Sequence, residues 1–94
     1  MLDATVRVPE HVVYREFPSE TVILNLNTGK YHGVNPTGGH MLDVLKDAGR
    51  VREAAARLAA DYGVPLDEIE RDLSEFCASL AQRELLQVDR VASE

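Results

Sequence analysis

The sequence predicts one small α+β domain, in which a three-stranded antiparallel N-terminal sheet is followed by three α-helices. The 94 residues suffice for one compact domain, and a hydrophobic fraction of 45% supplies material for its core. Residues 11–34 consist of short β-rich segments between turn signals. Residues 36–83 instead repeat apolar side chains at helical spacing. Strands and helices therefore occupy separate parts of the chain, which is typical of an α+β domain.

The sheet is predicted from three segments, residues 11–15, 21–26 and 30–34. The middle segment is the strongest candidate because it is β-branched, apolar and bounded on both sides. Pro18 separates it from the first segment, since proline fixes its own backbone and offers no amide donor. Gly29 lies where the loop of a β-hairpin needs a left-handed residue, so the second and third segments are predicted to pair.

Three helices are predicted to follow, over residues 36–48, 51–62 and 66–83. The first begins at Asn35-Pro36, because asparagine caps free amides and proline is pre-set for the first helical position. Gly49 is placed to end it in a left-handed conformation. Gly38 and Gly39 are poor helix formers in its first turn, so close backbone packing is expected there. The second helix has a narrow alanine-rich face, whereas the third carries large apolar side chains on one side.

The boundaries follow from these elements. Residues 1–10 are predicted to be an N-terminal tail, 11–88 the folded domain and 89–94 a C-terminal tail, with 85–88 as a candidate for a short final strand. Strands first and helices second resembles a winged helix-turn-helix whose wing comes first. The start lacks the basic and apolar regions of a secretory signal, and no apolar run approaches the roughly 20 residues of a membrane span. A cytoplasmic protein that does not contact the membrane is therefore expected.

Composition excludes several classes of function. A net charge of −6 argues against binding nucleic acid, which requires many cationic contacts to phosphates. The third helix, which would enter DNA in a winged helix, is itself rich in acidic residues. The single cysteine excludes an internal disulfide and a zinc-ribbon cluster.

No catalytic or metal-binding constellation stands out, so the sequence predicts neither an enzyme nor a cofactor. His11, His32 and His40 have no Cys, Asp or Glu at ligand spacing and are expected to be surface or edge histidines. Cys77 follows Phe76 on the apolar side of the third helix, where cysteine usually acts as a small hydrophobe. The glycines form no phosphate-binding loop.

Two surfaces remain as candidates for binding. The third strand segment ends a meander and is a natural sheet edge, to which an extended peptide could add as a further strand. The third helix has a wider apolar stripe than the alanine-rich second helix needs, although core filling is the alternative for each of Ile69, Leu73, Phe76 and Leu80. Its flank with Asp72 and Ser79 is the predicted wall of a groove.

Residues 27–42, which read Asn-Thr-Gly-Lys-Tyr-His-Gly-Val-Asn-Pro-Thr-Gly-Gly-His-Met-Leu, resemble the hairpin-to-helix segment of PqqD-like proteins. Residues 51–58, 62–64, 67–73 and 84–86 also match, so the resemblance covers about residues 11–88. These proteins are recognition elements that bind the leaders of ribosomally made, post-translationally modified peptides. The chain is more similar to the stand-alone members of lasso-peptide clusters than to the member of the PQQ pathway.

The resemblance implies that a precursor's leader adds antiparallel to the third strand and lies in a cleft against the third helix. A separate leader peptidase or other modifying enzyme would then receive the precursor. The peptide-binding residues implied are Lys30, Tyr31, His32, Gly33, Val34, Ile69, Asp72, Leu73, Phe76 and Ser79. A proline at position 32 would weaken binding if that amide faces the peptide.

Two alternatives stay open beside this interpretation. One is a small winged-helix DNA-binding module, and the other is a scaffolding module that holds two enzymes together. The oligomeric state is also open, because a hairpin beside a hinge at Asn35-Pro36 is compatible with a monomer or a domain-swapped dimer.

Overall fold

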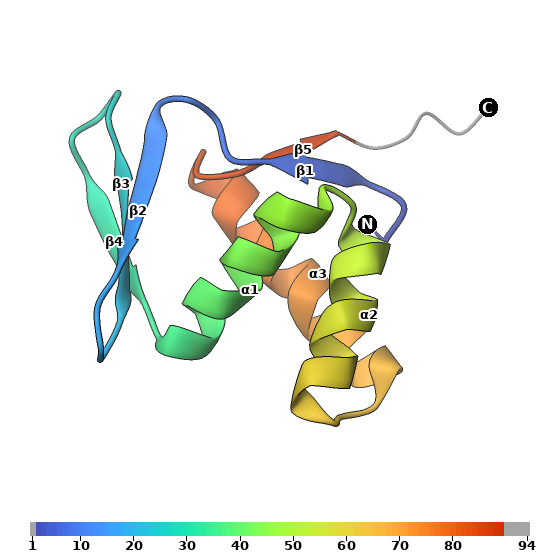
Figure 1. Cartoon of the computed structure of the whole chain (residues 1–94). Coiled ribbons are helices and arrows are strands. Elements are labelled where there is room, and N and C mark those ends of the chain that lie inside the picture. The colour runs from blue at the N-terminus through green and yellow to red at the C-terminus, as the bar shows by residue number, and fades with distance from the viewer. Residues whose placement is uncertain (1, 90–94) are drawn as a thin grey trace.

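A computed structural model describes residues 2–89 and confirms the predicted α+β order. The elements are β1 (Thr5–Arg7), β2 (Val12–Glu16), β3 (Thr21–Asn25), β4 (Tyr31–Val34), α1 (Pro36–Ala48), α2 (Val51–Tyr62), α3 (Leu66–Gln82) and β5 (Gln87–Asp89). Strands β2, β3 and β4 form one antiparallel sheet in that order, and β1 pairs with β5 in a second sheet. In Figure 1 the three-stranded sheet stands beside the helices, and the β1–β5 pair lies across one end of them.

Local signals place the ends of α1 and the turn of the hairpin as predicted. The Asn35 side chain accepts a hydrogen bond of 2.7 Å from the amide of Gly38, which caps the first turn. Gly49 has φ +74° and donates its amide to the carbonyl of Leu45. Gly29 also has φ +74°, in the loop that joins β3 to β4. At each position only nearby residues are involved, and the sequence pattern is therefore sufficient.

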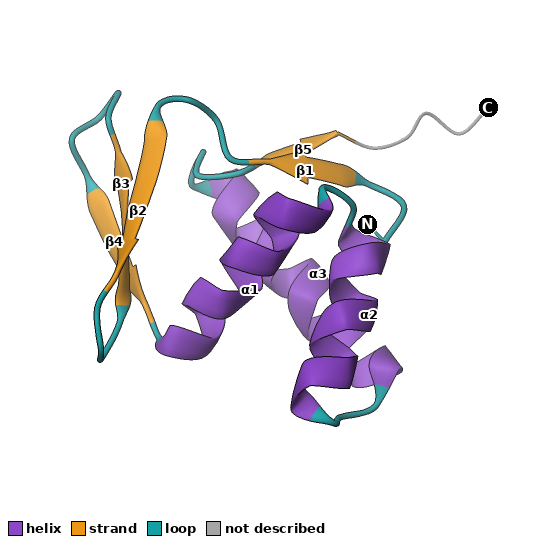
Figure 2. Cartoon of the chain, viewed as in Figure 1, coloured by secondary structure: helices purple, strands orange, loops and turns teal. Residues whose placement is uncertain are grey.

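The helices cover one face of the three-stranded sheet. Along β3, Thr21, Ile23 and Asn25 are buried while the alternate residues are half-buried, as expected when one face meets a core. Figure 2 shows all three helices on the same side of this sheet. A Cβ atom at Gly39 would overlap the Thr21 side chain, so the first turn of α1 lies directly against β3. The close backbone packing that the sequence predicts is therefore confirmed at Gly39.

The N-terminal segment corrects the predicted boundaries. Residues 1–10 were expected to form a tail, but Thr5–Arg7 is β1 and pairs with Gln87–Asp89. Ala4 and Val6 are buried, and the Val6 amide donates to the carbonyl of Gly49 at 2.9 Å. The pairing joins segments about 80 residues apart, so no local pattern announces it.

The C-terminal boundary shifts for the same reason. The candidate strand at 85–88 is in fact Gln87–Asp89, because Leu85 and Leu86 turn into the core. The predicted tail 89–94 therefore loses Asp89 to β5, and residues 90–94 lie outside the described part of the chain.

Candidate functional site

The outer edge of β4 is free of any strand partner within residues 2–89, since β4 is the last strand of the sheet. The backbone N–H of Asn25 donates to the backbone carbonyl of Lys30 at 2.9 Å, so these two residues form a hydrogen-bonded pair of the β3–β4 ladder. Such pairs alternate along an antiparallel ladder, so His32, opposite Ile23, bonds inward to β3. Tyr31 and Gly33 therefore direct their backbone N–H and C=O groups away from β3.

This alternation corrects one expectation about the edge. A proline at His32 was expected to affect a bound peptide if its amide faced outward, but that amide belongs to the β3–β4 ladder. The outward amides are those of Tyr31 and Gly33.

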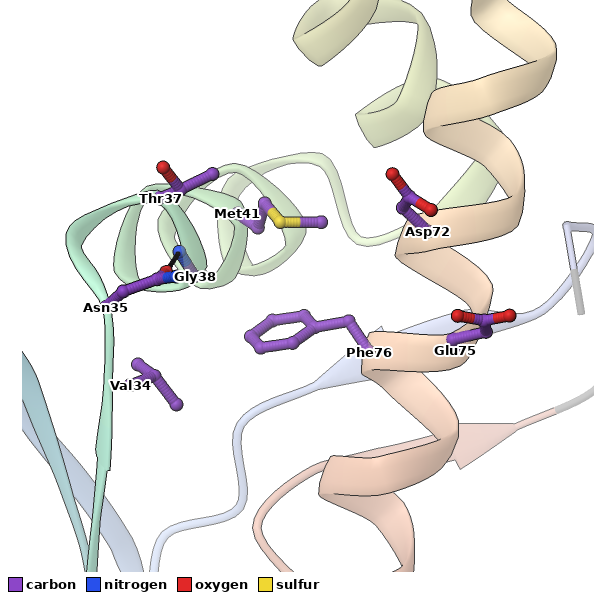
Figure 3. A pocket seen from close by; sticks show the side chains of 8 residues that line it. All are labelled: Val34, Asn35, Thr37, Gly38, Met41, Asp72, Glu75 and Phe76. Carbon is purple, nitrogen blue, oxygen red and sulfur yellow. Dashed lines mark hydrogen bonds between the residues drawn. The ribbon is translucent and has the colours of Figure 1, made fainter.

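A cavity of about 490 Å³ lies where β4 runs into α1, and α3 forms its opposite wall. Its lining is Val34, Asn35, Thr37, Gly38, Met41, Asp72, Glu75 and Phe76. In Figure 3 the Phe76 ring extends from α3 toward Val34 and Gly38, and Met41 extends from α1 toward α3. A Cβ atom at Gly38 would lie 3.2 Å from Cβ of Val34 and 3.3 Å from Oδ1 of Asn35, so the absence of a side chain there lets the end of β4 pack tightly on α1; the Phe76 ring, at 3.5 Å, would be in ordinary contact. The cavity thus has an apolar floor and two carboxylates at its α3 side.

A second cavity, of about 260 Å³, lies at the other end of β4. Its lining is Asn25, Thr28, Lys30, His32, Gln82, Arg83 and Glu84. On the α3 side, Asp72 and Phe76 lie on one stripe of the helix, and Arg83, directly after its last residue, continues that stripe. We call the two cavities, the edge of β4 and this stripe the β4–α3 groove.

Most of the predicted site residues border the β4–α3 groove. Lys30, His32, Val34, Asp72 and Phe76 line its cavities.

The other predicted residues of this region are placed differently. Tyr31 and Gly33 contribute the edge backbone, and the Tyr31 side chain is 72% exposed on the sheet face that points away from the helices. Ser79 is half-buried on the same α3 stripe and lines neither cavity.

Two predicted site residues belong to the core instead. Ile69 and Leu73 have exposed fractions of 8% and 0%, and they pack among the buried residues of the helices. They were expected to face the cleft because a helical stripe does not tell which of its residues meets a neighbouring element. The core interpretation, the alternative given for them, is the correct one.

Sequence reasoning also missed five residues that line the first cavity: Asn35, Thr37, Gly38, Met41 and Glu75. Four of them are the N-cap of α1 and residues of its first two turns, where the expected close packing at Gly38 was the available signal. Glu75 could have been predicted, because it lies three residues after Asp72 on the predicted wall of the groove.

Residues 2–89 contain no group of three His, Cys, Asp or Glu side chains that could hold a metal ion. Cys77 is fully buried in the core, and burial raises the pKa of its thiol to about 11. A thiol with that pKa is a poor nucleophile near neutral pH. Within the same residues, no helix is long and apolar enough to cross a membrane.

Comparison with known proteins gives two kinds of match. The family described as "Coenzyme PQQ synthesis protein D (PqqD)" matches residues 20–86. Among solved structures, "TbiB1 in Complex with the TbiA(beta) Leader Peptide" is 33% identical, with 86% of this chain and 94% of that chain covered and a TM-score of 0.78. "Lasso peptide synthetase B1 complexed with the leader peptide" is 22% identical, with 88% and 98% covered and a TM-score of 0.78, which shows a shared fold. No curated protein matches the chain.

Proposed function

The chain belongs to the PqqD family, and on that premise we propose that it binds the leader segment of a ribosomally made precursor peptide as an added strand in the β4–α3 groove. The observation that carries the proposal is the free edge of β4, which runs between two cavities that both reach α3. Support comes from TbiB1, a 33% identical protein of the same fold whose structure was solved with a leader peptide.

The backbone supplies affinity that tolerates sequence variation. Tyr31 and Gly33 each offer one N–H and one C=O to a neighbouring strand. An antiparallel leader is favoured, because antiparallel pairing is slightly more stable per residue than parallel pairing. Alternate leader side chains then point toward the helices, beside His32 and Val34, which lie on the helix-facing side of β4. Selectivity comes from these side chains.

Apolar anchoring supplies most of the net affinity. A flexible leader loses conformational entropy when it becomes ordered, and exposed backbone hydrogen bonds offset little of that loss. One apolar side chain, or the aliphatic stem of a longer one, buried against Phe76, Met41 and Val34 contributes about 1.5–3 kcal/mol. The first cavity, at about 490 Å³, is large enough for such an anchor.

We further infer that the chain is a binding module and not an enzyme, and that it delivers the precursor to a separate leader peptidase or another modifying enzyme. The chemistry of the groove supports this, because within residues 2–89 the Thr28 and Thr37 hydroxyls of its lining form no hydrogen bond to His32 or to a carboxylate that could act as a base.

Titration of a fluorescently labelled leader, taken from the precursor encoded beside this gene, tests the proposal. Phe76→Asp should weaken binding tenfold or more, because a carboxylate replaces the apolar floor next to Asp72 and Glu75. Phe76→Leu is the matched control and should retain most of the affinity. Circular dichroism of both variants checks the fold, which should persist because Phe76 is only half-buried. Absence of binding by the unmodified chain at high micromolar leader would refute the proposal.

A further inference from the structure

The end of the β4–α3 groove beside Val34 is acidic. Asp72 and Glu75 line the cavity there, and the Asp72 side chain is 51% exposed. Its contact with Arg71 is long, at 3.7 Å, and Arg71 is itself 69% exposed. Such a pair is weak and leaves the carboxylates available to a ligand.

The other end of the β4–α3 groove has the opposite character. Lys30 and Arg83 line that cavity together with one carboxylate, Glu84. Within residues 2–89, neither Lys30 nor Arg83 forms an ion pair with another side chain. A ligand that spans β4 therefore meets negative charge at one end and positive charge at the other.

The register of β4 decides which ligand positions meet these charges. Lys30, His32 and Val34 have side chains on the helix-facing side, because alternate residues share a face. Residues of an added antiparallel strand that lie opposite Val34 and Lys30 point to the same side. They are four positions apart, as Val34 and Lys30 are, and the one opposite Val34 comes first in the ligand.

We propose that the groove selects leaders in which a lysine or arginine is followed four positions later by an aspartate or glutamate. This deepens the proposed function and rests on it. The first residue would lay its aliphatic stem on Phe76 and Met41 and hold its cationic head at Asp72 and Glu75. The second would meet Lys30 and Arg83.

The same charges fix the direction of the leader. A peptide with the reverse order of charge, or one added in the opposite direction, would bring like charges together at both ends. Each exposed ion pair changes the dissociation constant by about threefold at low salt, so losing both should cost about tenfold, and exchanging the two charges should cost more because repulsion is added at both ends. The effect should shrink at about 0.5 M salt, where screening is strong.

Selection from a displayed library of random short peptides, with the full chain as bait, tests the charge order. Enriched peptides should carry the cation and the anion in that order and at that spacing. Fluorescence anisotropy then compares one enriched peptide with the same peptide whose two charged residues are exchanged. Asp72→Lys with Glu75→Lys should reverse the preference for a cation at the first position and keep the preference for an anion at the second. Lys30→Glu with Arg83→Glu should keep the first preference and reverse the second. Asp67→Lys with Glu68→Lys alters charge equally on α3, outside both cavities, and should change neither preference.

The possible results separate the two proposals. Enriched peptides without a charge order, or with the reverse order, would overturn the charge selection and leave peptide binding intact. An unchanged preference in the Asp72 and Glu75 double variant would also overturn it. Failure to enrich any peptide, together with failure to bind the labelled leader, would overturn the proposed function itself.

Discussion

Proline at Gly33 isolates the contribution of the β4 edge. Proline removes the amide of residue 33, which points away from β3, and leaves the inward bonds of the β3–β4 ladder in place. A Cβ atom at this position would meet only the carboxylate of Glu20, with Oε1 at 2.6 Å and Cδ at 3.7 Å, which is the far end of an exposed side chain that can move. The fold should therefore tolerate the change, with a loss of less than about 1 kcal/mol in unfolding free energy.

The effect on binding should be larger than the effect on stability. A leader strand would lose one backbone hydrogen bond and keep an unpaired carbonyl at the interface. Together these cost about 2 kcal/mol, which raises the dissociation constant about 30-fold. His32→Pro is the matched control, because its amide bonds to Ile23 inside the sheet. That variant should lose about 2 kcal/mol of stability and about 10 °C in Tm.

Leader anisotropy and thermal denaturation by circular dichroism distinguish these outcomes. Gly33→Pro should keep its Tm within a few degrees and bind weakly, while His32→Pro should melt early. Native affinity in Gly33→Pro would refute strand addition to β4. Equal destabilisation by the two prolines would show that the assigned phase of the β3–β4 hydrogen bonds is wrong.

Four further predictions concern Gly39, Glu84 and Cys77. Gly39→Ala should cost about 2 kcal/mol in unfolding free energy, because the new methyl overlaps the buried Thr21 side chain; an unchanged urea midpoint would contradict this. Glu84→Gly should stabilise the chain by about 0.5–1 kcal/mol, since Glu84 has φ +60°, and Glu84→Ala is the control that keeps the strain. Burial raises the pKa of the Cys77 thiol to about 11. Between about pH 9 and pH 11 the thiol therefore keeps its proton in the folded chain and loses it in the unfolded chain. The free energy of unfolding should fall as pH rises above about 9. Alkylation of this cysteine by iodoacetamide at about pH 8 should be slow and should accelerate in urea; rapid reaction of the native chain would argue against its burial.

The helices and the hairpin were predictable because their signals are local. Asn35 and Gly49 bound α1 through contacts within a few residues, and Gly29 sets the hairpin loop by its own backbone conformation. The pairing of β1 with β5 was not predictable in this way. Three-residue strands carry almost no periodicity, and three helices separate these two strands in the sequence.

The residues of the β4–α3 groove were likewise predictable only in part. The sequence pattern and the family resemblance pointed to β4 and α3, yet they included Ile69 and Leu73 with Phe76. All three share the apolar side of α3, and only the position of α1 and α2 decides that Phe76 faces the cavity while the other two are buried. Helical periodicity defines a face but does not define what that face meets.

By itself, the sequence determined the order of the elements from β2 to α3, the ends of α1 and the acidic charge that argues against nucleic acid, because these depend on neighbouring residues or on a sum. Only the tertiary structure decided that Tyr31 and Gly33 carry the outward backbone groups, and that Asp72 and Lys30 stand at opposite ends of one groove. The phase of a strand ladder and the distance between α3 and β4 are set by the packing of segments remote in sequence, which no local pattern encodes.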